Sequence, residues 1–147
     1  LDVPRPVETA GRIDGAETVF VVEDEAPLRG LIRSTLEPYG YRVLEAPDGG
    51  AALVLLDRAP ERVDLLLTDI VMPRMSGIEL AGHLRVSQPG LCVLFMSGYS
   101  EGPPDAEAAI VEGVPFLQKP FAPETLVRKI REILDNARSA PGRPGPS

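Results

Sequence analysis

Short apolar segments rich in β-branched residues alternate with longer segments of helical periodicity along most of this chain. The strand-like segments cover residues 18–23, 41–45, 63–68, 91–96 and 114–118, and the helix-like segments cover residues 26–37, 48–59, 78–87, 105–112 and 123–138. Strands this apolar are typical of sheets buried on both faces. Strands that alternate with helices pair in parallel through right-handed crossovers. We therefore predict an α/β fold with a five-stranded parallel sheet and helices on both faces.

Each predicted helix carries apolar residues that we expect to face the sheet. We expect the first helix to bury Leu28, Leu31, Ile32 and Leu36, the second Ala51, Ala52, Leu55 and Leu56, the third Leu80, Ala81 and Leu84, and the last Leu126, Val127, Ile130, Ile133 and Leu134. Asp48 is a candidate N-cap for the second helix, which Pro60 ends.

The chain is long enough for one well-buried core, because it has 147 residues of which 44% are apolar. Residues 1–16 and 139–147 are rich in Pro and Gly and lack a regular period. We interpret 1–16 as a linker, 17–138 as a single domain and 139–147 as a disordered tail. The first residue is Leu1 and not Met, so we expect a piece of a longer protein.

Charge and composition exclude several classes of function. A formal net charge of −7 argues against nucleic-acid contact, which needs clustered Lys and Arg. Cys92 is the single cysteine, so we expect neither a disulfide framework nor a thiolate metal site, and a reducing, cytoplasmic location fits. No apolar run approaches the length of a membrane span, and we expect no membrane contact by this domain.

Polar residues follow the predicted strands where each strand ends. Glu23 and Asp24 end the first strand, Asp69 the third, Ser97 the fourth and Lys119 the fifth. Ligands of doubly wound sheets bind beyond the carboxyl ends of the strands, where the strand order reverses. A flavodoxin-like order 2-1-3-4-5 brings all of these ends to one crevice.

This set of side chains has a specific chemistry. Two carboxylates about 4 Å apart repel each other by about 4 kcal/mol at an effective dielectric constant near 20, so three together need a cation or a shifted pKa. Mg²⁺ prefers oxygen ligands and is commonly held by one or two carboxylates together with phosphate oxygens. For phosphoryl transfer, Asp69 supplies a nucleophile, Lys119 a cation and Ser97 a hydroxyl.

Four motifs in order then resemble the receiver domains of two-component response regulators. They are Val-Val-Glu-Asp-Glu (21–25), Leu-Thr-Asp-Ile-Val-Met-Pro-Arg-Met-Ser-Gly (67–77), Phe-Met-Ser-Gly-Tyr (95–99) and Leu-Gln-Lys-Pro-Phe (117–121), and the resemblance spans roughly residues 17–136. By this resemblance Asp69 is the phosphoacceptor. The same resemblance implies that Glu23, Asp24, Asp69 and the backbone carbonyl of Val71 are the ligands of Mg²⁺, for which we expect Mn²⁺ to substitute.

The resemblance also implies a conformational switch. It implies that Lys119 and Ser97 contact the phosphoryl group and that the Lys119–Pro120 peptide bond is cis. Phe116 stands at the family's aromatic switch position, where it lacks the hydroxyl of the more common tyrosine. We expect the signal to reach the face formed by residues 105–112, the fifth strand and the last helix. The domain would catalyse only its own phosphorylation and dephosphorylation.

The resemblance also implies the partners of the domain. A histidine kinase or a histidine phosphotransfer domain would supply the phosphoryl group, and output would pass to a downstream protein or an attached domain. The motifs and the Pro-containing leader resemble receivers at the C-terminus of hybrid sensor histidine kinases. The sequence leaves homodimerisation open.

Other classes of protein also use parts of this chemistry. A haloacid-dehalogenase-like phosphatase needs its nucleophile at the end of the first strand with a second acid two residues on, a pattern that residues 23–25 do not make. A flavin carrier needs a Ser/Thr/Gly-rich loop after that strand. A pseudo-receiver that binds partners without being phosphorylated remains an alternative, against which the intact Asp69, Lys119 and acidic pair count.

Overall fold

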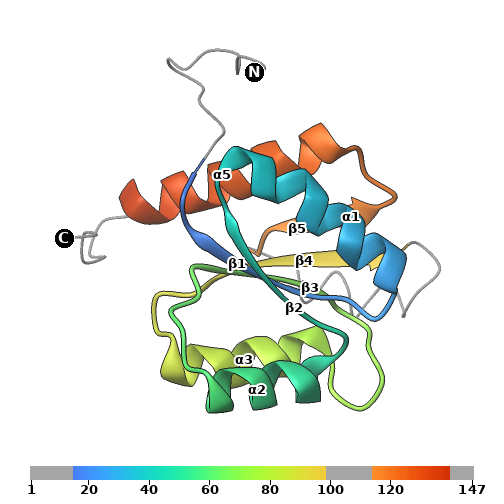
Figure 1. Cartoon of the computed structure of the whole chain (residues 1–147), viewed down its shortest axis with the longest axis vertical. Helices are drawn as coiled ribbons and strands as arrows, with labels where there is room; N and C mark the ends of the chain where they lie inside the picture. The colour runs from blue at the N-terminus through green and yellow to red at the C-terminus, as the bar shows by residue number, and fades with distance from the viewer. Residues whose placement is uncertain (1–14, 99–113, 140–147) are drawn as a thin grey trace.

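The computed structural model describes residues 15–98 and 114–139 and contains one five-stranded sheet (Figure 1). The strands are β1 (Thr18–Val22), β2 (Arg42–Ala46), β3 (Leu65–Asp69), β4 (Cys92–Gly98) and β5 (Phe116–Lys119). All neighbouring pairs are parallel and the order is β2-β1-β3-β4-β5, which confirms the predicted doubly wound topology.

The helices follow the strands in the predicted alternation. They are α1 (Ala26–Leu36) with a 3₁₀ turn η1 (Glu37–Tyr39), α2 (Gly49–Arg58), α3 (Gly77–Ser87) and α5 (Pro123–Ser139). The predicted helix at 105–112, residues 1–14 of the predicted linker and residues 140–147 of the predicted tail lie outside the described residues. The predicted ends of the strands were wrong by one or two residues, because long-range pairing sets them: β4 continues to Gly98 since Ser97 and Gly98 pair with β5.

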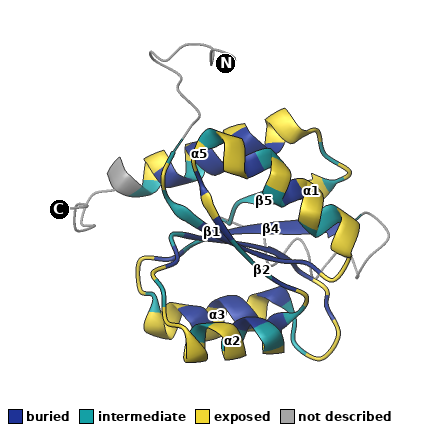
Figure 2. Ribbon diagram, in the orientation of Figure 1, coloured by how far each residue is buried: buried dark blue, intermediate teal, exposed yellow. Residues whose placement is uncertain are grey.

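The sheet is covered on both faces. Helices α1 and α5 lie against one face, and α2 and α3 lie against the other (Figures 1 and 2). Alternate residues of β1 point to opposite faces: Val19 and Val21 join the core under α1 and α5, whereas Phe20 and Val22 join the core under α2 and α3. The sheet is therefore a rigid platform whose strand ends hold fixed positions.

Two residues of the predicted helix stripes are exposed, so that part of the prediction was wrong. Leu31 of α1 is 51% exposed and Leu55 of α2 is 36% exposed. On α1 the buried residues Ile32 and Leu36 are one helical turn apart, and Leu31 lies about 100° around the helix from Ile32. Helices α1 and α2 therefore bury a narrower stripe against the sheet than their apolar residues predict.

Local hydrogen bonds fix where two helices begin. As predicted, the Asp48 carboxylate caps α2, since it accepts a hydrogen bond of 2.8 Å from the Ala51 N–H. Helix α3 begins with a capping box in which Ser76 Oγ accepts from the Glu79 N–H and the Glu79 carboxylate accepts from the Ser76 N–H. The second cap fixes the end of the loop that follows Asp69.

A buried arginine joins the start of the domain to α5. Arg131 is 8% exposed and donates two hydrogen bonds to the Glu17 carboxylate, from Nη1 at 3.1 Å and from Nη2 at 2.8 Å. Nη1 also donates to the Tyr41 hydroxyl, and Nη2 lies 2.9 Å from the Asp135 carboxylate. Burial alone would raise the pKa of Glu17, but the hydrogen bonds and the charge of Arg131, together with backbone hydrogen bonds, outweigh burial and hold the pKa below its ordinary value.

Glu17→Gln is expected to destabilise the protein by about 1.5–3 kcal/mol at pH 7, because a charged hydrogen bond to a buried guanidinium is lost. Since the folded-state pKa of Glu17 is lowered, its contribution is present above the unfolded-state pKa and disappears as the pH falls through the folded-state pKa. Urea unfolding at pH 7 and at roughly pH 3 measures this difference. Asp135→Asn is the control, since the Asp135 side chain is 57% exposed. Equal losses in the two variants would contradict the prediction.

Candidate functional site

Four of the five polar residues predicted to converge, Glu23, Asp24, Asp69 and Lys119, lie together at the carboxyl ends of the strands. Glu23 follows β1, Asp69 ends β3 and Lys119 ends β5. Glu23 is fully buried and Asp69 is 2% exposed. Carboxylates are rarely buried to this degree without a partner.

Lys119 is that partner, because its ammonium bridges the two buried carboxylates. Lys119 Nζ lies 2.7 Å from Asp69 Oδ1 and 3.1 Å from Glu23 Oε1. The second oxygen of Glu23, Oε2, accepts a 2.9 Å hydrogen bond from the Glu25 N–H. Residues 96 positions apart in the chain thus form one charged cluster.

The cluster perturbs the protonation of its members. Burial, followed by the hydrogen bond and the charge of Asp69, raises the pKa of Glu23 to about 8. Burial alone would lower the pKa of Lys119, but its hydrogen bond with Asp69 and the charges of Asp69 and Glu23 hold that pKa above its ordinary value. Lys119 is therefore a permanent cation beside two closely spaced carboxyl groups. Perturbed groups of this kind, gathered in one cluster, are typical of functional sites.

Asp24 completes an acidic cluster with Glu23 and Asp69. One carboxylate oxygen from each of the three lies within 4.8 Å of the others, and Asp24 is exposed while the other two are buried. Three oxygen donors converging from a buried edge toward solvent fit the ligand preference of a hard divalent cation. Val71, the fourth predicted ligand through its carbonyl, lies two residues beyond β3 in the loop that follows Asp69.

Ser97 and Phe116 occupy neighbouring strands. Ser97 is 2% exposed, and its hydroxyl donates a 3.2 Å hydrogen bond to the Gly98 carbonyl. Phe116 pairs with Phe95 in the β4–β5 register and is partly buried against the core under α2 and α3. The peptide bond between Lys119 and Pro120 is cis, as expected from the sequence.

The backbone of Asp69 is packed directly against the start of α3. A Cβ atom built on Gly77 would lie 2.1 Å from the Asp69 carbonyl oxygen, and the Gly77 N–H donates to the Ile70 carbonyl at 2.8 Å. Only glycine allows this approach, which holds α3 against the end of β3.

Gly77→Ala is expected to destabilise the protein by roughly 1–3 kcal/mol, because the added methyl group must push the Asp69 backbone away. Gly82→Ala is the matched control: Gly82 lies in the same helix, and a Cβ there meets nothing within 4 Å. Alanine should stabilise α3 at that position by about 0.5–1 kcal/mol. Urea unfolding of the two variants measures both effects, and a neutral or stabilising Gly77→Ala would contradict the close contact.

Sequence reasoning missed one cation near the site. Arg29 of α1 donates from Nη1 to the Glu23 backbone carbonyl at 2.6 Å and from Nε to Glu45 Oε1 at 3.2 Å. In the sequence Arg29 has the position of an ordinary solvated helix residue. The only signal in the sequence for this contact was the spacing of six residues between Arg29 and Glu23, which a turn can bring together.

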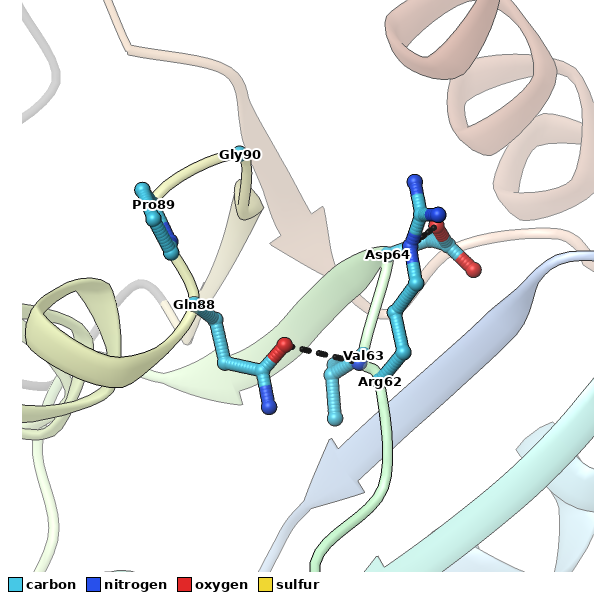
Figure 3. Close-up of a pocket in the computed structure, with 6 residues that line it drawn as sticks. All are labelled: Arg62, Val63, Asp64, Gln88, Pro89 and Gly90. Atoms are coloured by element: carbon cyan, nitrogen blue, oxygen red, sulfur yellow. Dashed lines mark hydrogen bonds and ion pairs between the residues drawn. The ribbon is translucent and has the colours of Figure 1, made fainter. Parts of the chain in front are cut away.

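A separate pocket lies near the opposite, amino ends of β3 and β4. It has a volume of about 260 Å³ and is lined by Arg62, Val63, Asp64, Gln88, Pro89 and Gly90 (Figure 3). Its polar groups are already paired: Gln88 Oε1 accepts from the Val63 N–H, and Arg62 Nε lies 3.1 Å from Asp64 Oδ1 (Figure 3). The acidic cluster at the carboxyl ends of the strands is therefore the stronger candidate site.

In the part of the chain that the structure describes, no helix has both the length and the apolar character needed to cross a membrane.

An open, doubly wound α/β sheet with polar side chains at its switch point defines a class of α/β domains that bind their ligands at that edge. The response regulator receiver domain family matches residues 19–131, and this chain belongs to that family.

Individual relatives agree with this assignment. The chain is 36% identical over 138 residues to the sensor kinase CckA of Brucella abortus, a match that covers 89% of this chain and 14% of that protein. It is 34% identical over 116 residues to the response regulator receiver protein CpdR of the same organism, covering 79% of this chain and 95% of that protein. A crystal structure of the receiver domain from the hybrid histidine kinase CckA superposes with a TM-score of 0.66 at 32% identity, covering 80% of this chain and 98% of that one.

Proposed function

We propose that this receiver domain accepts a phosphoryl group on Asp69 and acts as a phosphorylation switch. The observation that carries the proposal is the position of Lys119 Nζ, 2.7 Å from the Asp69 carboxylate and 3.1 Å from that of Glu23. A carboxylate at a switch point, with a cation beside it and oxygen ligands around it, has the groups that phosphoryl transfer requires.

In the proposed reaction an Asp69 oxygen bonds to the phosphorus of the donor while the bond from phosphorus to the donor's leaving atom breaks. The leaving group takes the electron pair of that bond. The Lys119 ammonium neutralises charge on the phosphoryl oxygens, and the Ser97 hydroxyl donates to one of them after turning from the Gly98 carbonyl. A bound Mg²⁺ would supply further positive charge to the same oxygens.

We assign the metal-binding role to Glu23, Asp24, Asp69 and the carbonyl of Val71. The convergence of three carboxylates within 4.8 Å supports the assignment, because such a set binds a hard divalent cation. Mn²⁺ has similar ligand preferences and is expected to substitute.

The proposed output passes through Ser97 and Phe116 to the face that includes β5 and α5. Support comes from their places on adjacent strands, where Phe116 pairs with Phe95. A histidine kinase or a histidine phosphotransfer domain is the proposed cytoplasmic donor. The similarity to the sensor kinase CckA over 89% of this chain supports a place in a hybrid kinase. The chain spans 14% of the length of that relative and 54% of the length of the transcriptional regulator PhoB of Pseudomonas aeruginosa. A place in a hybrid kinase is therefore part of the proposal.

The test is incubation of the native protein with acetyl phosphate and Mg²⁺, followed by intact-mass and peptide mass spectrometry. The proposal expects one added phosphoryl group, located on Asp69 and lost when Mg²⁺ is chelated before the reaction. A native protein that gains no phosphoryl group from acetyl phosphate or from a phosphorylated histidine domain would instead be a pseudo-receiver that binds partners without being phosphorylated.

A further inference from the structure

Arg29 is the feature of the site that the proposed phosphoryl chemistry does not use. It lies on α1, and its side chain is 19% exposed. One guanidinium nitrogen, Nη1, donates to the Glu23 backbone carbonyl at 2.6 Å, and Nε lies 3.2 Å from Glu45 Oε1 of β2. Arg29 thus ties the β1–α1 turn, which carries two of the proposed metal ligands, to a neighbouring strand.

The Glu23 residue is held at four points by different parts of the fold. Its N–H donates to the Ala46 carbonyl at 3.1 Å and its carbonyl accepts from Arg29. Its carboxylate accepts from Lys119 Nζ at 3.1 Å and from the Glu25 N–H at 2.9 Å. Of these contacts, the one from Arg29 fixes the carbonyl of the peptide unit that joins Glu23 to Asp24.

Asp24 depends on that peptide unit for its orientation. Its side chain is exposed, and within the described residues it makes no hydrogen bond. The backbone that precedes Asp24 therefore sets where its side chain begins, and the carboxylate reaches only the positions that the side-chain rotamers allow from there. A peptide plane that rotates freely would spread this carboxylate over many positions, most of them unsuitable for binding a cation with Glu23 and Asp69.

We propose that Arg29 is a positioning residue for the divalent-cation site, because it locks the Glu23–Asp24 peptide plane and so pre-orients Asp24. This inference rests on the proposed function, which places a cation among Glu23, Asp24 and Asp69. Groups that hold metal ligands without touching the metal typically change metal affinity by about 10–100-fold when they are removed.

A purely electrostatic role of Arg29 predicts a change in cation affinity of the opposite sign, so a binding measurement can distinguish the two roles. Arg29 is a positive charge near a cation site, so its removal without loss of geometry should strengthen cation binding. Loss of the carbonyl contact should weaken it. The direction of the change therefore separates a positioning role from a purely electrostatic one.

Arg33 provides a matched control on the same helix. Its Nη1 pairs with Glu45, the carboxylate that Arg29 also contacts, and its Nε lies 2.8 Å from Glu37 Oε2. Its described hydrogen bonds do not include one to the Glu23 carbonyl. Arg33→Met removes a charge from the same network while leaving the peptide plane held.

The experiment titrates the full chain with Mn²⁺ and measures free Mn²⁺ by electron paramagnetic resonance at fixed pH and ionic strength. The titration of Asp24→Ala, with no other substitution, first shows whether Mn²⁺ binds at the acidic cluster. Arg29→Met is expected to weaken Mn²⁺ binding about tenfold and Arg33→Met to change it less than about twofold. Circular dichroism verifies folding, and Arg29→Gln gives the same result if Arg29→Met is unstable.

Unchanged or tighter Mn²⁺ binding by the Arg29 variants would overturn the inference, as would equal weakening by the Arg29 and Arg33 variants. In either case the metal site of the proposed function would stand, since the native protein binds and Asp24→Ala does not. If Asp24→Ala binds Mn²⁺ as the native protein does, the proposed metal site itself fails, together with the role of Arg29.

Discussion

Replacing Asp69 with Asn or Ala is expected to abolish phosphorylation of the domain by acetyl phosphate. The reaction needs a carboxylate oxygen as nucleophile, and an amide or a methyl group cannot provide one. The neighbouring carboxylate of Glu23 is not equivalent, because its two oxygens already accept hydrogen bonds from Lys119 and from the Glu25 N–H. Asp69→Asn also retains the shape of the side chain, so loss of labelling in that variant reports on chemistry and not on packing.

Glu25→Gln is the matched control for this result. It removes a carboxylate from the same turn but leaves the backbone N–H that bonds to Glu23, so labelling should persist. Intact-mass spectrometry measures the phosphorylated fraction, and circular dichroism verifies that each variant is folded. Labelling that survived in both Asp69 variants at the native extent would move the phosphoacceptor to another residue.

Much of this fold was predictable because buried parallel strands carry a strong local signal. Segments such as Leu65–Asp69, which is buried throughout, have no polar residue before their carboxyl end except Thr68. The alternation of strands and helices then leaves few topologies. The convergence of Glu23, Asp69 and Lys119 followed from that topology, since parallel strands bring their carboxyl ends to one edge of the sheet.

The remaining features depend on contacts that a sequence does not encode locally. Arg29 reaches the Glu23 carbonyl across a turn, and Gly77 approaches the Asp69 carbonyl because α3 packs there. Arg131 was also missed, although it lies on the stripe with Val127 and Leu134 at a spacing that predicts burial. Leu31 shows the reverse error, since an apolar residue beside a buried stripe remained exposed.

Magnesium is expected to stabilise the folded protein through the acidic cluster. In the unfolded chain Asp69 is far from Glu23 and Asp24, whereas folding brings all three within 4.8 Å. Lys119 offsets part of their repulsion through its ion pairs with Glu23 and Asp69, but it has no ion pair with Asp24 among the described contacts. A ligand that binds only the folded state stabilises it by about 2.7 kcal/mol at a hundredfold excess over Kd.

Thermal melts at fixed pH and matched ionic strength measure this effect. Millimolar Mg²⁺ should raise the Tm of the native protein more than Na⁺ does, because Na⁺ only screens the repulsion whereas Mg²⁺ binds the carboxylates directly. Asp24→Ala should remove most of the Mg²⁺ response. In the metal-free protein the same substitution removes one of the repelling charges and should raise the stability, by less than about 0.5 kcal/mol because Asp24 is exposed. A Mg²⁺ response that is as large in Asp24→Ala as in the native protein would mean that the stabilising cation binds outside this cluster, since Asp24 is the one member of the cluster that extends into solvent.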